Sequence, residues 1–184
     1  CEQYGKGTDV AVRSSATTED SEDASFAGQY ESFLNIHGED NVVLHWRKCV
    51  ASQFTERAIC YQLDRDMDPL ASPLCVVVMK MVRSDLASSG VMFTIDPDSG
   101  HDGVVHIAAS YGLGELIVQG TVSPDTYTVW KEGLLKDKFA IVHRHLGSKD
   151  QRMVYASDGV RATTVEEVPF SERRDWALGS EECK

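Results

Sequence analysis

The sequence has neither an excess of basic residues nor a long hydrophobic run. Its 184 residues include 18 Lys and Arg but 29 Asp and Glu, which gives a formal net charge of −11 at pH 7. Nucleic-acid backbones and anionic membrane surfaces are bound by clusters of Lys and Arg, so we expect neither as a partner. The longest apolar run, residues 74–79, is far shorter than the roughly 20 residues of a membrane-spanning helix.

Closely spaced pairs of cysteines are absent as well. The five cysteines are odd in number and no two are spaced as C-x-x-C, which disfavours a disulfide framework and a zinc site. Free cysteines are the usual state in a reducing cytosol, so we expect a cytoplasmic protein. The chain begins at Cys1 rather than at a methionine and has no basic-then-apolar leader, so we also expect a fragment or a processed chain.

Apolar sequence sufficient for a folded core is present. Hydrophobic residues make up 42% of the chain and aromatic residues 8%, and the length favours a single domain. Alternating apolar residues predict a short strand at residues 9–13 and a second strand at residues 30–36. The loop between them is rich in Ser, Thr, Asp and Gly, which is typical of an exposed connection.

Residues 39–66 have the period of a helix. Val43, Trp46, Val50 and Phe54 recur three and four residues apart, and no Pro or Gly interrupts the stretch. We expect one long packing helix there, or two short ones. After residue 69 the apolar residues alternate as they do in strands. We also expect a short helix near Leu113, a hairpin within residues 147–170 and a helical or frayed tail from about residue 171. The expected strands are residues 74–82, 90–95, 104–110, 126–130 and 139–142.

These elements predict an α+β layer fold, a mostly antiparallel sheet with a long packing helix, over residues 1–184 as one domain. Common catalytic and metal motifs are absent from it. The sequence has no Walker A loop, no G-x-G-x-x-G fingerprint and no H-E-x-x-H pair. Residues 96–100 begin like a calcium loop but lack its closing glutamate, so a tight turn is the better interpretation. His143 and His145 share one side of a strand, which is more often a polar face than a metal site.

One segment has the composition of a phosphate cradle. A strand ends at Arg13, whose guanidinium is always charged and forked to bind phosphate oxygens. In the loop and strand that follow, Gly28 allows close backbone approach and Ser32 supplies a hydroxyl. The alternative is that Arg13 pairs with a carboxylate in a solvated loop, the candidates being Glu19, Asp20, Glu22 and Asp23.

Four stretches together resemble a known family. They are VAVRSSATTEDSEDASFAGQYESFLN (residues 10–35), MVRSDLASSGVMFTIDPDSG (81–100), ASYGLGELIVQGTVSPDTYTV (109–129) and GSKDQRMVYA (147–156). In this order they resemble the nucleotide-binding domain of the phosphoenolpyruvate synthases (pyruvate, water dikinases). Wider relatives of that family are pyruvate phosphate dikinase and rifampin phosphotransferase.

The resemblance implies an ATP-grasp fold that holds ATP between two lobes. It also implies the reaction ATP + pyruvate + water → AMP + phosphoenolpyruvate + phosphate, through a phosphohistidine on a mobile domain. Carried over by position, Arg13 is the catalytic arginine that grips the ATP phosphates, and Gly28 and Ser32 lie beside them. Lys80 and Val82 fall in the segment whose backbone meets adenine. Glu115 is a weaker nucleotide-binding candidate, because it is equally a carboxylate at a helix N-terminus.

Some parts of the family pattern differ or lie elsewhere. Met79 stands where the family usually has Gln, which replaces a hydrogen-bonding amide with an apolar chain. The family's phosphate-binding lysine lies before Cys1 and its metal-binding acids lie after Lys184, so we expect no metal ligand within residues 1–184. The cofactors implied are ATP and Mg²⁺, since the phosphates need cations beside a chain of this charge.

The implied partners are ATP and the phosphohistidine and pyruvate-binding domains of a homodimeric parent protein. The isolated chain is therefore not expected to complete the reaction. Two alternatives stay open. The chain is the ATP module of a rifampin-type phosphotransferase, or it is a catalytically silent binding domain with the same fold.

Overall fold

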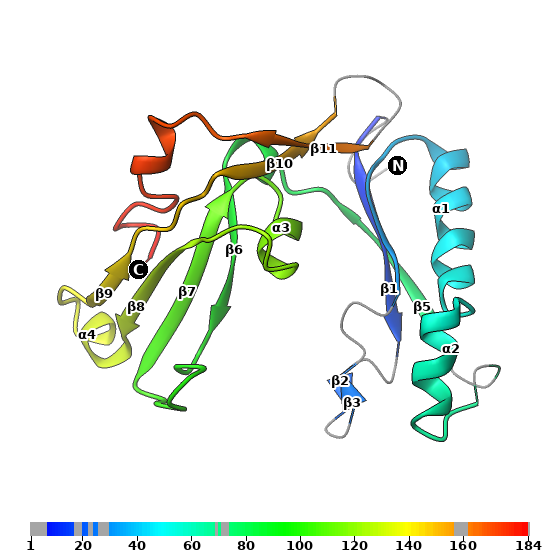
Figure 1. Cartoon of the computed structure of the whole chain (residues 1–184), viewed down its shortest axis with the longest axis horizontal. Coiled ribbons are helices and arrows are strands. Elements are labelled where there is room, and N and C mark those ends of the chain that lie inside the picture. Colours follow the sequence, from blue (N-terminus) through cyan, green and yellow to red (C-terminus); the bar gives the residue numbers. More distant parts are fainter. Residues whose placement is uncertain are drawn as a thin grey trace. The chain divides into compact units, whose positions relative to one another are not determined.

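The computed structural model describes residues 7–16, 20–21, 24–25, 30–68, 70, 74–156 and 162–183. Two compact units divide the chain, Cys1–Val82 and Arg83–Lys184, and each has its own sheet (Figure 1). The ladders between named strands are antiparallel in both units. This confirms the predicted mixture of helices and antiparallel sheet. Within the described ranges, no helix is both long and apolar enough to cross a bilayer.

The first unit is a three-stranded sheet with helices packed on one face. The strand order is β4–β1–β5, where β1 is Val10–Ala16, β4 is Ser32–Ile36 and β5 is Leu74–Lys80. The short strands β2 (Asp20–Ser21) and β3 (Ala24–Ser25) form a separate hairpin within the loop that follows β1. β1 is the central strand and continues three residues beyond the predicted end at Arg13, so Arg13 lies in the middle of this strand, paired with Ser32 of β4.

Alternation along the strands decides which face the helices cover. Val12 is fully buried and packs with Ile36 and with Cys49 of α1 (Glu39–Ser52). Successive strand residues point to opposite faces, so Arg13 lies on the face away from α1. The burial of Val12 in the core of the first unit therefore fixes the direction of the next side chain, that of Arg13.

Two helices, rather than one long packing helix, occupy the region from residue 39. α1 ends at Ser52, and α2 spans Glu56–Leu63. The break has a local cause at Thr55, which has extended backbone angles and accepts a hydrogen bond from the Ala58 amide through its side chain. Such an N-cap starts a new helix. The prediction of a single long helix is not confirmed, and the alternative of two short helices describes this region.

The second unit is built on a four-stranded sheet in the order β6–β7–β8–β9, with a separate hairpin of β10 and β11. The strands expected in this region are all present, with bounds shifted by a few residues. Two short α-helices and two 3₁₀ turns precede, connect or follow them. The bounds are η1 (Ser84–Leu86), β6 (Ser88–Phe93), β7 (Val104–Tyr111), α3 (Glu115–Val118), β8 (Asp125–Trp130), α4 (Lys131–Leu135), β9 (Ile141–His145), β10 (Gln151–Tyr155), β11 (Thr163–Glu167) and η2 (Glu172–Arg174).

The last described segment completes the core of the second unit. After η2 the chain crosses the sheet, and Ala177 and Cys183 are buried against Tyr127 and Val129 of β8. The side chain of Trp176 adds a tilted contact with the Tyr127 ring, 5.6 Å between centroids. We expected a helical or frayed tail here, and its described residues instead form a 3₁₀ turn and then a packed, irregular segment.

Candidate functional site

Arg13 and Ser32 are neighbours on the open face of the first sheet. They are paired across β1 and β4, and Arg13 is paired with Val77 on its other side, across β1 and β5. Directly paired residues share a face, so these three side chains lie in one row. Arg13 and Ser32 are exposed, and Val77 and Met79 of β5 are 44% and 46% exposed on the same face. The row joins a guanidinium and a hydroxyl to an apolar strip.

The guanidinium of Arg13 forms no ion pair with any side chain that the structure describes. The loop acids considered as its alternative partners, Glu19, Asp20, Glu22 and Asp23, lie outside the side chains described. Gly28 also lies outside the described residues, so its predicted place beside the phosphates stays a prediction. The sheet thus brings together two of the three cradle residues.

Lys80 and Val82 lie at the end of β5, and the register decides what they present. Lys80 is paired with Val10, so its side chain leaves the sheet on the α1 face, opposite to Arg13. The Met81 amide donates to the Asp9 carbonyl of β1, 3.1 Å. Backbone groups of an antiparallel strand alternate between its two sides, so those of Lys80, the last residue of β5, point away from β1, toward the outer edge of the strand. Val82 lies two residues beyond the strand, so the predicted role of its backbone stays a prediction. Any role of these residues in a site on this edge is therefore one for their backbone.

Glu115 belongs to the second unit, where it begins α3. It is exposed, and its carboxylate accepts a hydrogen bond from the Gln119 side chain one turn later, 3.1 Å. The preceding loop is held firmly. The Gly112 carbonyl accepts from the Ser89 hydroxyl, 2.6 Å, and the Leu113 amide donates to the Met153 carbonyl of β10, 2.9 Å. These contacts agree with the interpretation of Glu115 as a carboxylate at the N-terminus of a helix.

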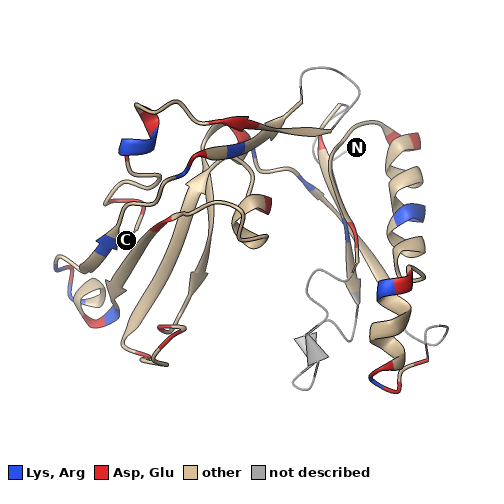
Figure 2. Cartoon of the chain, viewed as in Figure 1, with Lys and Arg blue, Asp and Glu red and all other residues tan. Residues whose placement is uncertain are grey.

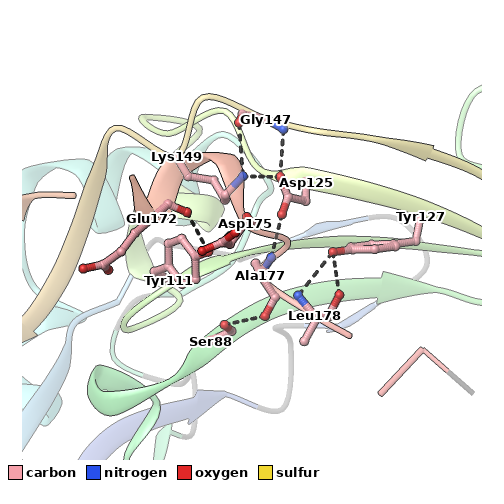
Figure 3. A network of polar contacts seen from close by, with 10 residues as sticks. All are labelled: Ser88, Tyr111, Asp125, Tyr127, Gly147, Lys149, Glu172, Asp175, Ala177 and Leu178. Atoms are coloured by element: carbon pink, nitrogen blue, oxygen red, sulfur yellow. Dashed lines mark hydrogen bonds and ion pairs between the residues drawn. The ribbon is translucent and has the colours of Figure 1, made fainter. Parts of the chain in front are cut away.

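A buried ion pair is the strongest polar feature of the second unit, and the sequence did not reveal it. Asp125 and Lys149 are both completely buried, and the Lys149 ammonium lies 2.5 Å from Asp125 Oδ1 (Figure 3). The same oxygen accepts from the Gly147 amide, 2.8 Å, and Oδ2 accepts from the Ala177 amide, 2.7 Å. A buried charge is costly unless it is paired and hydrogen-bonded, and both oxygens here are satisfied.

Two tyrosines extend this network to the tail. Tyr127 donates through its hydroxyl to the Leu178 carbonyl, 3.1 Å, and accepts from the Leu178 amide, 3.2 Å. The Tyr111 hydroxyl lies 3.0 Å from both the Glu172 and the Asp175 carbonyl oxygens, which share its one proton (Figure 3). Burial raises the pKa of Tyr127 to about 12, and burial followed by the nearby Asp125 charge raises the pKa of Tyr111. The raised pKa of each tyrosine extends to higher pH the range in which its hydroxyl keeps its proton and can donate.

The sequence contained a signal for part of this network. Asp125, Tyr127 and Val129 alternate along β8 and are all buried, so Asp125 occupies a core position of an otherwise apolar strand face. An acid at such a position needs a cation or several donors. The partner Lys149 could not be chosen from the sequence, because it lies 24 residues away in a polar segment.

A pocket of about 680 Å³ opens in the second unit between η1, β10, β11 and η2. The charged side chains that line it form ion pairs with one another. Asp85 accepts two hydrogen bonds from Arg83, both at 2.8 Å, and Arg152 binds Glu166 at 2.7 Å and Glu172 at 2.9 Å. Figure 2 shows the two signs of charge side by side on this hairpin. Each of these charged side chains has a partner, but Arg152 is shared by two carboxylates, so the five charges leave the pocket with one excess negative charge, which does not favour an anionic ligand.

Metal-ligating residues are not clustered in the part of the chain that the structure covers. No group of three or more His, Cys, Asp or Glu is arranged there to hold an ion. His143 and His145 lie on β9, paired with Thr128 and Thr126, and both are exposed. The turn at residues 96–100 is closed by a hydrogen bond from the Gly100 amide to the Asp96 carbonyl, 2.9 Å, as expected for a tight turn.

Comparisons with known proteins identify the kind of domain. The family model described as "Pyruvate phosphate dikinase, AMP/ATP-binding domain" matches residues 1–184. Phosphoenolpyruvate synthases of Aquifex aeolicus and Escherichia coli are each 49% identical over 95% of the chain, and that of Synechocystis sp. is 49% identical over 99%. The chain spans about a fifth of the length of these relatives: 20% of the Aquifex protein, 22% of the Escherichia protein and 23% of the Synechocystis protein.

Proposed function

The chain belongs to the pyruvate phosphate dikinase AMP/ATP-binding domain family, and from this membership we propose that it is the ATP-binding part of a phosphoenolpyruvate synthase with an ATP-grasp fold. The parent protein converts ATP, pyruvate and water into AMP, phosphoenolpyruvate and phosphate by way of a phosphohistidine. Family membership carries the proposal, and the structural observation that supports the place of the nucleotide is the group of Arg13, Ser32, Val77 and Met79 on the open face of the first sheet.

The edge of β5 suits an adenine base. Adenine presents an amino donor next to a ring acceptor, and we propose that it meets the backbone carbonyl of Lys80, at the end of β5, and the backbone amide of Val82, two residues later. Met79, where the family usually has Gln, lies on the Arg13 face and supplies an apolar, polarizable surface there. Recognition of the base then rests on backbone groups, so the loss of the family's amide at position 79 does not remove it.

Arg13 holds the phosphates in this proposal. Its forked guanidinium binds two phosphate oxygens at once, and the Ser32 hydroxyl beside it donates a third hydrogen bond. We propose that Gly28 lets the loop backbone approach the same phosphates. ATP also needs Mg²⁺ to neutralise its charge, with ligands from segments beyond residues 1–184. Glu115 stays a weaker candidate for this site.

The remaining assignments follow from the same membership. We propose that residues 1–184 form one partial domain made of both units. We also propose that the phosphohistidine and pyruvate-binding domains belong to the rest of a homodimeric, cytoplasmic parent protein. The short coverage of the relatives supports this, because about four fifths of their length lies outside the matched region.

The substitution Arg13→Ala in the intact parent protein tests the proposal. The side chain is exposed, so the fold should persist, while a lost charge-assisted contact should weaken ATP binding roughly 10- to 100-fold. The measurement is ATP-dependent formation of phosphohistidine, with ATP affinity measured by calorimetry. Arg47→Ala is the matched control, since Arg47 is exposed on α1 and carries the same charge. Equal behaviour of the two variants would refute the assignment of Arg13.

A further inference from the structure

The buried ion pair joins three segments that are far apart in the sequence. Asp125 opens β8, Lys149 precedes β10, and the Ala177 amide that binds Asp125 Oδ2 belongs to the tail. The two oxygens divide this work. Oδ1 holds Gly147 and Lys149, whereas Oδ2 holds Ala177 (Figure 3). A second contact of the Lys149 ammonium, to the Gly147 carbonyl at 3.2 Å, closes the loop on itself.

The pair fixes the point at which β10 begins. The Lys149 backbone has a φ of +42°, which an L-residue adopts only when its surroundings hold it there. Its amide donates to the Ser123 carbonyl, 3.1 Å, just before β8, and the next residue, Asp150, accepts from the Val168 amide, 2.9 Å. The side-chain pair and these backbone bonds therefore set both the position and the direction of the entering strand.

β10 in turn holds the loop before α3. Gly112 forms a parallel bridge with Met153, and the Leu113 amide donates to the Met153 carbonyl. The approach is close, because a Cβ on Gly112 would come within 2.5 Å of that carbonyl oxygen. Because the bridge and the hydrogen bond join Gly112 and Leu113 to Met153, a shift of β10 would move Gly112, and with it the first residue of α3, Glu115.

From this chain of contacts we infer that Asp125 and Lys149 are positioning residues, whose ion pair sets the place of the Gly112–Glu115 segment by fixing the start of β10. The consequence for nucleotide binding rests on the proposed function, which places Glu115 as a weaker candidate at the ATP site. The positioning of the Gly112–Glu115 segment by the ion pair, the mechanical part, follows from the described contacts alone. It is tested separately from the effect on nucleotide binding, the functional part.

Lys149→Met tests the mechanical part in the 184-residue chain. The variant keeps the bonds from Asp125 to Gly147 and Ala177 but removes the cation, so the start of β10 loses its anchor. Hydrogen exchange at the Leu113 amide should become about tenfold faster relative to exchange at the Tyr127 amide in the middle of the sheet. Val129→Ala is the control, because it removes buried volume from the same sheet without touching the pair. An unchanged ratio of the two amides in Lys149→Met, or the same change in Val129→Ala, overturns the inference.

Asp125→Asn is the second variant, in case Lys149→Met does not fold. An amide group keeps one acceptor for Gly147 and Lys149 but turns a donor toward the Ala177 amide. Exchange at Ala177 should therefore rise about tenfold, and exchange at Leu113 should rise with it because the pair has lost its negative charge. A rise at Ala177 with no change at Leu113 would show that the pair holds only the tail, and would overturn the positioning role.

The functional part is measured in the intact parent protein. Lys149→Met should raise the KM for ATP about tenfold over Val129→Ala while kcat changes less, because the machinery that grips the phosphates on β1 is untouched. If the unaltered parent does not bind ATP, the proposed function fails while the exchange results still decide the mechanical part. If the parent binds ATP and both variants have the same KM, the positioning role in nucleotide binding is refuted.

Discussion

Gly112 has a φ of +81° and lies against the backbone of Met153. Gly112→Ala combines an unfavourable backbone conformation with a clash against a carbonyl that cannot move freely. We expect a loss of about 3 kcal/mol in the free energy of unfolding, measured with urea. Gly120→Ala is the control, because its φ is +67° but no atom lies within 4 Å of the added Cβ, so it should lose only about 1 kcal/mol. Equal losses in the two variants would contradict the close packing of β10 on this loop.

Tyr127 should make the stability of the protein depend on pH in the alkaline range. Its pKa rises from 10.0 to about 12 on folding, because burial disfavours the phenolate. Between these two values the unfolded tyrosine loses its proton while the folded one keeps it, so the unfolded state binds fewer protons and stability falls as pH rises. The contribution is fully present below pH 10 and decreases by about 2 kcal/mol by pH 12.

Tyr127→Phe separates this effect from other groups that titrate in the same range. The variant should be about 1 kcal/mol less stable at pH 8, since it lacks the hydroxyl that binds Leu178, and its alkaline decline should be shallower. The measurement is the urea-derived free energy of unfolding from pH 8 to 11. Parallel curves for the two proteins would show that Tyr127 titrates normally in the folded state.

The residues of the site differ in how far the sequence could identify them. The sequence placed Arg13 and Ser32 each on a predicted strand, because period and turn composition are local signals, whereas the pairing of these strands is a finding of the structure. The opposite faces of Arg13 and Lys80 depend on the β1–β5 register across more than 60 residues of intervening sequence, which no local pattern contains. The pairing of Asp125 with Lys149 was missed for the same reason, although the alternation of Asp125 with buried residues of β8 was a local signal for its burial.

At the scale of elements, Thr55 determines where one helix ends and the next begins. Its hydroxyl donates to the Ser52 carbonyl of α1, 3.0 Å, and accepts from the Ala58 amide of α2. Thr55→Ala should cost about 1 kcal/mol in the free energy of unfolding, because it leaves both backbone groups without these partners. Thr55→Ser retains the hydroxyl and should restore most of this stability. Failure of Ser to do so would assign the loss to the methyl group instead.

Helix period alone could not reveal this break. The apolar spacing from Val43 to Phe54 is compatible with a continuous helix, and no Pro or Gly marks an interruption. A threonine has ordinary helix propensity, so its capping role becomes visible only through its extended backbone. By contrast, each predicted strand from residue 74 to residue 142 was found, because Gly, Pro and Asp turns bound each of them.

At the scale of the whole molecule, the second unit has a core of its own. Ala109, Tyr127, Val129, Ala140 and Ile141 are buried together with tail residues of the same unit. We therefore expect residues 83–184, expressed alone, to unfold cooperatively in urea, followed by far-ultraviolet circular dichroism. A non-cooperative transition would show that the core needs the first unit. Removal of residues 175–184 from this piece should abolish the cooperative transition, because it exposes the apolar side of β8.

The tail also has a consequence for the time at which the second unit becomes stable in a cell. Ser88 binds the Ala177 carbonyl across 89 residues of sequence, and Asp125 binds the Ala177 amide across 52. At a synthesis rate of about 5–20 residues per second, Ser88 waits roughly 4–18 seconds for its partner to be made. During that interval the first unit, already synthesised, has time to fold, while the apolar face of β8 in the second unit is still uncovered. This interval is the stage at which a nascent chain of this kind most needs protection from aggregation.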